Sequence, residues 1–171
     1  FKDVRNIQME TVYFDNNATT RMAEEVFEEI KPYFCKFYGN PSSMHSFGGD
    51  LSGKLVQARE RIAKLLGCRA EEIIFASGGT ESDNTAIRSA IESQGDRRKL
   101  ITSSVEHLAV LEVCRSLKSK GYEVIELGVD KNGRIDPVEL EERIDDNTAL
   151  VSIMQANNET GTIFDVNKLA G

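Results

Sequence analysis

The stretch LITSSVEHLAVLEVCRSLKSKGYEVIEL, residues 100–127, decides the fold. It begins with a short apolar run at 100–103, continues at 107–119 with apolar residues at helical spacing, and ends in a partly β-branched run at 122–127. These features predict a strand, a helix and a second strand. Because two parallel strands need a crossover connection of this kind, the stretch favours an α/β architecture with a largely parallel sheet.

The same alternation continues on both sides of this stretch. Upstream, EIIFA at 72–76 predicts a strand, SGGT at 77–80 a turn, and the apolar spacing over 86–91 a helix. Downstream, Asp136-Pro137 predicts the start of a helix, because proline is favoured at the first helical position. Residues 148–154 then predict a further strand.

Three more helices are predicted outside the strand region. Apolar residues recur at helical spacing from Met22 to Ile30, and we expect Pro32 to end that helix. A second apolar face runs from Leu51 to Leu66 and is expected to stop at Gly67. The last residues, 164–171, predict the beginning of another helix.

The composition fits one globular domain and disfavours several classes of protein. Hydrophobic residues make up 40% of the 171 residues and charged residues 29%, with a formal net charge of −7. An acidic chain repels polyanions, so we expect neither nucleic acid nor a membrane as a partner. The chain contains no apolar run near the ~20 residues of a membrane span, and its first residues lack the apolar core of a signal peptide. We therefore expect a cytoplasmic protein.

The cysteines and histidines show no metal-binding pattern. Cys35, Cys68 and Cys114 lie far apart with no CxxC pair, which argues against a disulfide framework and a structural zinc site. We expect reduced thiols that are mostly buried or half-buried. No second histidine lies near His107 at ligand spacing, and His45 is interpreted as structural or close to substrate, so no metal site is predicted.

Three polar loops are predicted to share one edge of the sheet. They comprise residues 77–81, 104–107 and 155–161, and each follows a predicted strand. Ligands bind beyond the carboxyl ends of the strands in open parallel sheets. These loops are therefore the candidate binding site.

Each loop has a functional and a plainer interpretation. Gly78-Gly79-Thr80 before a helix can hold a phosphate, or can be a tight turn in which Ser77 or Thr80 caps the helix. His107 can stack on a planar ring or act as an acid or base, or can be a helix-start histidine bonded to the backbone. The amides in NNETG at 157–161 can orient a ligand, or can simply form a turn.

Five motifs in register resemble the NifS/IscS group of cysteine desulfurases. They are YFDNNATT at 13–20, GNPSSMH at 39–45, SGGTESDN at 77–84, Glu106-His107, and NNETG at 157–161. The resemblance extends from about residue 11 to the end of the chain. It implies part of the fold-type I transferase architecture that depends on pyridoxal 5'-phosphate (PLP), with three α/β/α layers and a mostly parallel sheet. It also implies a homodimer that takes sulfur from L-cysteine and releases L-alanine.

The resemblance implies roles for the matched residues only. Gly79 and Thr80 would hold the phosphate of PLP, and Asn158 would hydrogen-bond near the ring hydroxyl and the substrate. His107 would stack on the pyridine ring and assist proton transfer, which makes it the catalytic candidate of this chain. Residues 1–20 would belong to the small domain, and residues 21–171 would form the N-terminal part of the large PLP-binding domain.

Other groups of such enzymes have no counterpart in the motifs of this chain. The lysine that bonds the cofactor, the sulfur-accepting cysteine and the arginine that binds the substrate carboxylate follow the matched region in the family. We therefore expect a C-terminal half, on the same or a separate chain, to complete the site, and an acceptor or iron–sulfur scaffold protein to receive the sulfur. A selenocysteine lyase or related C–S lyase, and a non-catalytic scaffold half, remain as alternatives.

Overall fold

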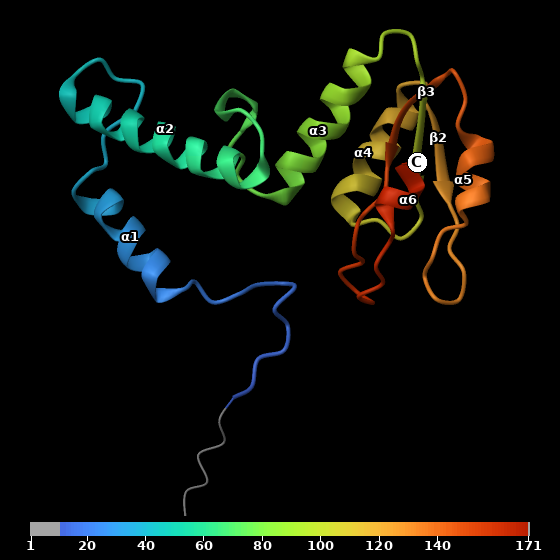
Figure 1. The fold of residues 1–171 in the computed structure, drawn as a ribbon, viewed down its shortest axis with the longest axis horizontal. Coiled ribbons are helices and arrows are strands. Elements are labelled where there is room, and N and C mark those ends of the chain that lie inside the picture. The colour runs from blue at the N-terminus through green and yellow to red at the C-terminus, as the bar shows by residue number, and fades with distance from the viewer. Residues whose placement is uncertain (1–10, 171) are drawn as a thin grey trace, which may run out of the picture. The chain divides into compact units, whose positions relative to one another are not determined.

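The computed structural model describes residues 11–170, which divide into two units with the boundary between Ile74 and Phe75 (Figure 1). The first ten residues, part of the segment assigned above to a small domain, lie outside the described residues. The assignment of residues 1–20 and 21–171 to two domains stays a prediction. Within the described residues, no helix is long and apolar enough to cross a membrane.

The first unit consists mainly of two helices, α1 (Glu24–Cys35) and α2 (Ser46–Leu66), followed by the short 3-10 helix η1 (Ala70–Glu72). The predicted end of α2 is confirmed, because Gly67 adopts the left-handed conformation with φ 70°. The predicted end of α1 at Pro32 is wrong, since the helix runs on to Cys35. Pro32 has no N–H to donate to the helix, but its carbonyl still accepts from the N–H groups of Lys36 and Phe37, so the last turn stays hydrogen-bonded.

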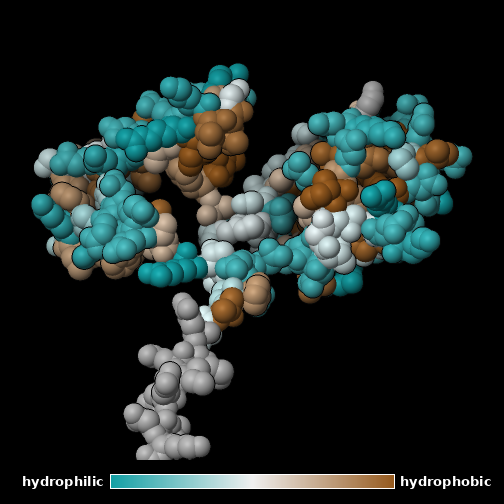
Figure 2. All heavy atoms as spheres, turned by 60° about the horizontal axis from the view of Figure 1, so that its bottom comes forward, coloured by the Kyte–Doolittle hydropathy of each residue, from teal (hydrophilic) through white to brown (hydrophobic). Residues whose placement is uncertain are grey.

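The first unit buries little of its apolar surface. None of the residues of α1 is buried, and α2 buries only Gly48 and Ala63. Large apolar side chains are exposed on both helices, among them Val26, Phe27, Phe34, Leu55 and Val56. Figure 2 shows apolar side chains of the protein at its surface in brown.

The predicted strand at 72–76 is wrong. Glu72 ends η1, and the residues that follow are extended but pair with no strand of the described chain. An extended segment becomes a strand only when its N–H and C=O groups find a partner edge. Here a side chain supplies one partner instead, because the Arg59 guanidinium donates to the Ile73 carbonyl.

The second unit contains a parallel sheet of three strands in the order β2-β1-β3. These are β1 (Lys99–Ser103), β2 (Glu123–Leu127) and β3 (Thr148–Ser152). Leu100 lies opposite Val124 and Leu150, and Ile101 lies opposite Ile125 and Val151. The prediction of a parallel α/β sheet from residues 100–127 is therefore confirmed.

Helices cover both faces of this sheet. On one face, α3 (Gly79–Ser93) and α4 (Leu108–Ser119) form a core with Leu100, through side chains such as Ile91 and Val113. On the other face, α5 (Pro137–Arg143) and α6 (Val166–Ala170) pack with Ile101, as in the contact of Leu140. Adjacent residues of β1 thus point to opposite layers, which is why every residue of this central strand is buried. The expected three-layer α/β/α arrangement is confirmed (Figure 1).

Candidate cofactor site

The strands β1 and β3 end at the same edge of the sheet at which α3 and α4 begin (Figure 1). Parallel pairing of neighbouring strands places their carboxyl ends together. The loops after β1 and β3 and the first turn of α3 therefore lie at one end of the second unit. The sequence predicts Gly79, Thr80, His107 and Asn158 as site residues, whereas Glu106 occurs only as part of the Glu106-His107 motif, without a predicted role.

The N-terminus of α3 has backbone donors without a capping side chain. Gly78 is the N-cap residue, and no side chain caps this helix. The alternative in which Ser77 or Thr80 caps α3 is therefore wrong. The first N–H groups of a helix have no acceptor inside the helix, and its dipole favours an anion there. A Cβ added at Gly78 or Gly79 would meet no atom within 4 Å, so a ligand has room to approach the backbone.

Glu81 ties the turn before α3 to its first turn. Its carboxylate accepts from the Ser77 N–H at 2.6 Å, and hydrogen bonds from the Ser77 side chain and backbone lower the pKa of Glu81. The Ser82 N–H donates to the Gly78 carbonyl, which closes the first turn. These bonds hold together the turn that contains Gly79 and Thr80, whose N–H groups lie in the first turn of α3 and so have no acceptor within the helix.

His107 is the N-cap residue of α4 and is exposed. Its Nδ1 accepts from the Ala109 N–H at 3.1 Å. Because Nδ1 acts as an acceptor, the neutral ring carries its proton on Nε2. The helix-start interpretation of His107 is therefore confirmed, and the same bond leaves the Nε2–H as the group of the ring that can donate to a bound molecule. Its stacking role stays a prediction.

The loop after β3 is organised by Asn157, with Asn158 exposed beside it. Asn157 Oδ1 accepts from the N–H groups of Glu159 and Thr160, and its backbone carbonyl accepts from Gly161. The turn interpretation thus holds for Asn157. Asn158 Nδ2 donates to the Glu159 carboxylate at 3.2 Å, and its role toward a cofactor stays a prediction.

Glu106, which precedes His107 in the Glu106-His107 motif, is a buried carboxylate. Its Oε1 accepts from Ser103 Oγ at 2.8 Å and from the Met154 N–H at 2.7 Å. Burial raises the pKa of Glu106, with a smaller contribution from the nearby charge of Asp83. No local sequence pattern indicates this hydrogen-bonding role, because one of its partners, Met154, is 48 positions away in the sequence.

The thiols of the described residues give no nucleophile for this site. Burial raises the pKa of Cys114 to about 11, which keeps it protonated at neutral pH. Cys35 and Cys68 are exposed, so the expectation of mostly buried thiols is wrong. Both belong to the first unit, whose helices bury few side chains.

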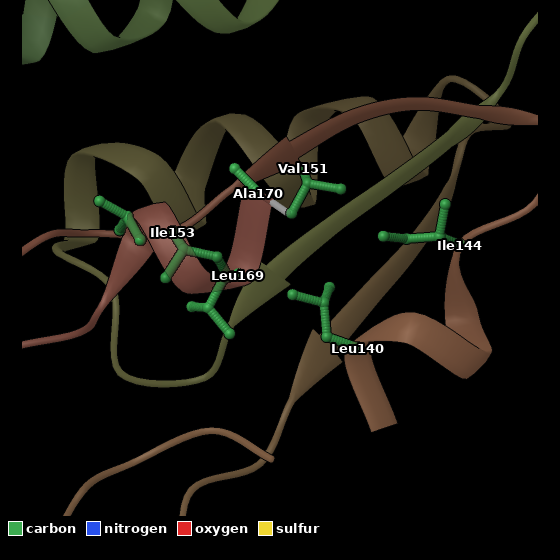
Figure 3. A pocket seen from close by; sticks show the side chains of 7 residues that line it. Leu140, Ile144, Val151, Ile153, Leu169 and Ala170 are labelled. Atoms are coloured by element: carbon green, nitrogen blue, oxygen red, sulfur yellow. The ribbon is translucent and has the colours of Figure 1, made fainter. Parts of the chain in front are cut away.

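An apolar groove of about 320 Å³ lies elsewhere in the second unit. Its lining comes from α5, β3, the following loop and α6, and includes Leu140, Val151, Ile153 and Leu169. Figure 3 shows these side chains converging on the groove. Every lining residue is apolar, so the groove offers no side-chain partner for a phosphate or a ring nitrogen.

The class-V aminotransferase family matches residues 12–171. The chain belongs to this family. Among its curated relatives, a cysteine desulfurase of Trichormus azollae is 52% identical over 94% of the chain, and cysteine desulfurase NifS of Azotobacter vinelandii is 49% identical over 95%. The chain spans about 40% of the length of these relatives.

Solved structures of class-V aminotransferase relatives agree with this assignment. A NifS-like protein matches 93% of the chain with a TM-score of 0.88 and 44% identity, over 44% of its own length. The protein SspA, solved in complex with cysteine, matches 93% of the chain with a TM-score of 0.86 and 39% identity, over 46% of its length. The fold expected from the motifs is therefore that of the fold-type I family, of which this chain forms a part.

The class-V aminotransferase relatives of this chain depend on PLP, and the residues present fit that cofactor. Its phosphate requires backbone donors at an open helix N-terminus, which α3 supplies at Gly79 and Thr80. Its aromatic ring requires a planar side chain and polar groups nearby, which the loops carrying His107 and Asn158 can supply. No group of three or more His, Cys, Asp or Glu residues among residues 11–170 could hold a metal ion.

Proposed function

We propose that the protein containing this chain is a cysteine desulfurase, which converts L-cysteine to L-alanine and passes the sulfur on as a persulfide. The observation that carries the proposal is the uncapped N-terminus of α3, located at the edge of the sheet where the His107 and Asn158 loops also lie. Identity of about 50% to named cysteine desulfurases supports the choice of substrate.

The phosphate of PLP is held by the start of α3. The N–H groups of Gly79 and Thr80 donate to its oxygens, and the Thr80 hydroxyl adds a third donor. The positive end of the helix dipole stabilises the phosphate charge. The bond between Ser77 and Glu81 keeps this turn in place before the cofactor binds, which reduces the entropic cost of binding.

His107 and Asn158 act on the ring side of the cofactor. The His107 imidazole would pack against the pyridine ring, and its Nε2–H would donate a hydrogen bond to the bound molecule, because Nδ1 already accepts from the Ala109 N–H. The Asn158 amide orients the ring hydroxyl and the substrate without adding a charge. When bound, PLP supplies the electron sink for the carbon–sulfur chemistry.

The remaining components of the site and the pathway are part of the same proposal. A C-terminal half of the enzyme, on the same or a separate chain, completes the site, and the protein acts as a cytoplasmic homodimer. An acceptor or iron–sulfur scaffold protein takes the sulfur, in keeping with the NifS and IscS names among the relatives.

The test is alanine formation by the purified protein after reconstitution with PLP. We expect L-cysteine to give alanine at a rate that depends on PLP, and L-selenocysteine to react no faster. Faster turnover of selenocysteine would favour a selenocysteine lyase instead. Activity is measured on untreated protein, and a separate sample is reduced with borohydride to fix any bound PLP. PLP fixed in the reduced sample with no alanine from either substrate in the untreated one would overturn the desulfurase proposal, and no fixed PLP would favour a scaffold.

A further inference from the structure

We propose that Glu106 is a positioning residue, which fixes the His107 loop against the Asn158 loop so that both side chains meet the same bound ring. The inference rests on the proposed function, because it concerns the same site. It assigns a role to a buried carboxylate that touches neither loop's functional side chain.

The carboxylate of Glu106 joins the ends of two neighbouring strands. It accepts from Ser103 Oγ at 2.8 Å, in the last residue of β1, and from the Met154 N–H at 2.7 Å, two residues beyond the end of β3. His107 follows Glu106 directly, and Asn158 lies in the loop that Met154 begins. One oxygen atom therefore links the two loops.

A second hydrogen bond joins the same loops. Asn157 Nδ2 donates to the Val105 carbonyl at 3.0 Å. Val105 and Asn157 are sequence neighbours of Glu106 and Asn158, respectively. In both bonds the loop after β3 donates, through the Met154 N–H and the Asn157 amide, and the loop after β1 accepts. Two such bonds restrain the loops more strongly than one.

The position requires hydrogen-bond acceptance more than negative charge. Glu106 is only 8% exposed, and burial together with the Asp83 charge disfavours its ionised form. An apolar side chain of similar size would avoid that cost but would leave the Met154 N–H without its partner. Gln keeps an oxygen in the same place and removes the charge, so it separates the two properties.

The loss of this link should act on the reaction through geometry. A shift of about 1 Å in a group that meets the reacting molecule can lower the rate by up to a hundred-fold. His107 is most sensitive, because it is adjacent to Glu106 and its exposed ring accepts a hydrogen bond from the Ala109 N–H on its own helix. The protein fold should tolerate the change, since the sheet pairs directly through β1 and β3.

The experiment compares Glu106→Ala, Glu106→Gln and a control, Glu112→Ala, in the purified protein. Glu112 is an exposed glutamate on α4 whose ion pair is with Arg115 on the same helix. Two measurements are made on each variant. The first records the imidazole NMR signals of His107 in the PLP-free protein, and the second determines kcat and KM for L-cysteine in the presence of PLP. The signal of His107 is assigned with His107→Gln, and His45 serves as the internal reference.

We expect Glu106→Ala to shift the His107 signals but not those of His45, and to lower kcat about ten- to hundred-fold with a smaller change in KM. Glu106→Gln should retain the wild-type signals and most of kcat, and Glu112→Ala should match wild type. Unchanged His107 signals in Glu106→Ala, or equal losses in the Gln and Ala variants, would overturn the proposal. Because the NMR measurement needs neither PLP nor cysteine, it decides the positioning role even if the desulfurase activity is absent.

Discussion

The Thr80 hydroxyl stands in the first turn of α3, where we place the phosphate of PLP. Thr80→Val removes that donor at nearly constant volume and should weaken PLP binding. A hydrogen bond to a charged group contributes about 1.5–3 kcal/mol, which corresponds to a Kd increase of roughly ten- to a hundred-fold. The measurement is a titration of the PLP-free protein followed by fluorescence.

The matched control for this titration is Thr85→Val. Thr85 is exposed on the same helix, beyond its first turn, so this change removes a hydroxyl without touching the proposed site. The control should bind PLP with wild-type affinity. Equal affinities for the Thr80 variant and wild type would place the phosphate elsewhere.

Glu106 gives a pH dependence whose sign follows from its raised pKa. The folded protein binds this proton more tightly than the unfolded chain, so the group stabilises the fold below its ordinary value of 4.5 and loses that contribution as pH rises through the folded pKa. Glu106→Gln removes the titration. Its melting temperature relative to wild type should therefore rise with pH across that interval, as measured by calorimetry at a series of pH values. A relative melting temperature that falls with pH would show that the carboxylate is stabilised in its charged form.

For the site residues, the sequence predicts the loop in which each residue lies better than it predicts the hydrogen bonds that join the loops. The glycines before α3 and the polar residues after β1 and β3 follow local patterns, so their loops could be predicted. The links between loops could not, because Glu106 meets a backbone N–H that is 48 positions away in sequence. No local pattern contains the partner of such a bond, since the sheet brings the two residues together.

Among the elements, α2 offers two glycines with opposite expected effects. Gly67 has φ 70°, so Gly67→Ala strains the C-cap and should cost about 1–2 kcal/mol. Gly53 lies inside the helix, where an added Cβ meets no atom within 4 Å. Gly53→Ala should therefore stabilise the helix by about 0.5–1 kcal/mol. Denaturant unfolding of both variants checks this pair, and effects of the same sign would contradict the assigned end of α2.

The elements predicted correctly are those whose signals are local. The spacing of apolar residues predicts α4, and Asp136-Pro137 predicts the start of α5. The alternation of strand-like and helix-like segments along the sequence predicts that the strands are parallel. The strand predicted at 72–76 is wrong because a strand requires a partner edge, and this segment pairs with none of the described strands. The helix α1 continues beyond Pro32 because the Pro32 carbonyl still accepts hydrogen bonds from the Lys36 and Phe37 N–H groups.

At the scale of the whole molecule, apolar surface is unevenly buried. Every residue of β1 is buried, whereas none of α1 is. In the isolated 171-residue chain, we expect the backbone amides of β1 to exchange with solvent at least about a hundred-fold more slowly than those of α1. Because so much apolar surface is exposed, we also expect this chain to aggregate or to stay partly unfolded. Hydrogen exchange followed by mass spectrometry measures both regions. Equal protection with one sharp melt would show that the two units fold together without further chain.

The central claim is that this chain provides the phosphate-binding and ring-facing half of a PLP site. A crystal structure of the purified protein with PLP tests it most directly. We predict phosphate oxygens about 3 Å from the backbone nitrogens of Gly79 and Thr80, with the His107 ring against the pyridine and Asn158 beside the ring hydroxyl. A phosphate bound away from the start of α3, or a pyridine ring that does not contact His107, would contradict the account.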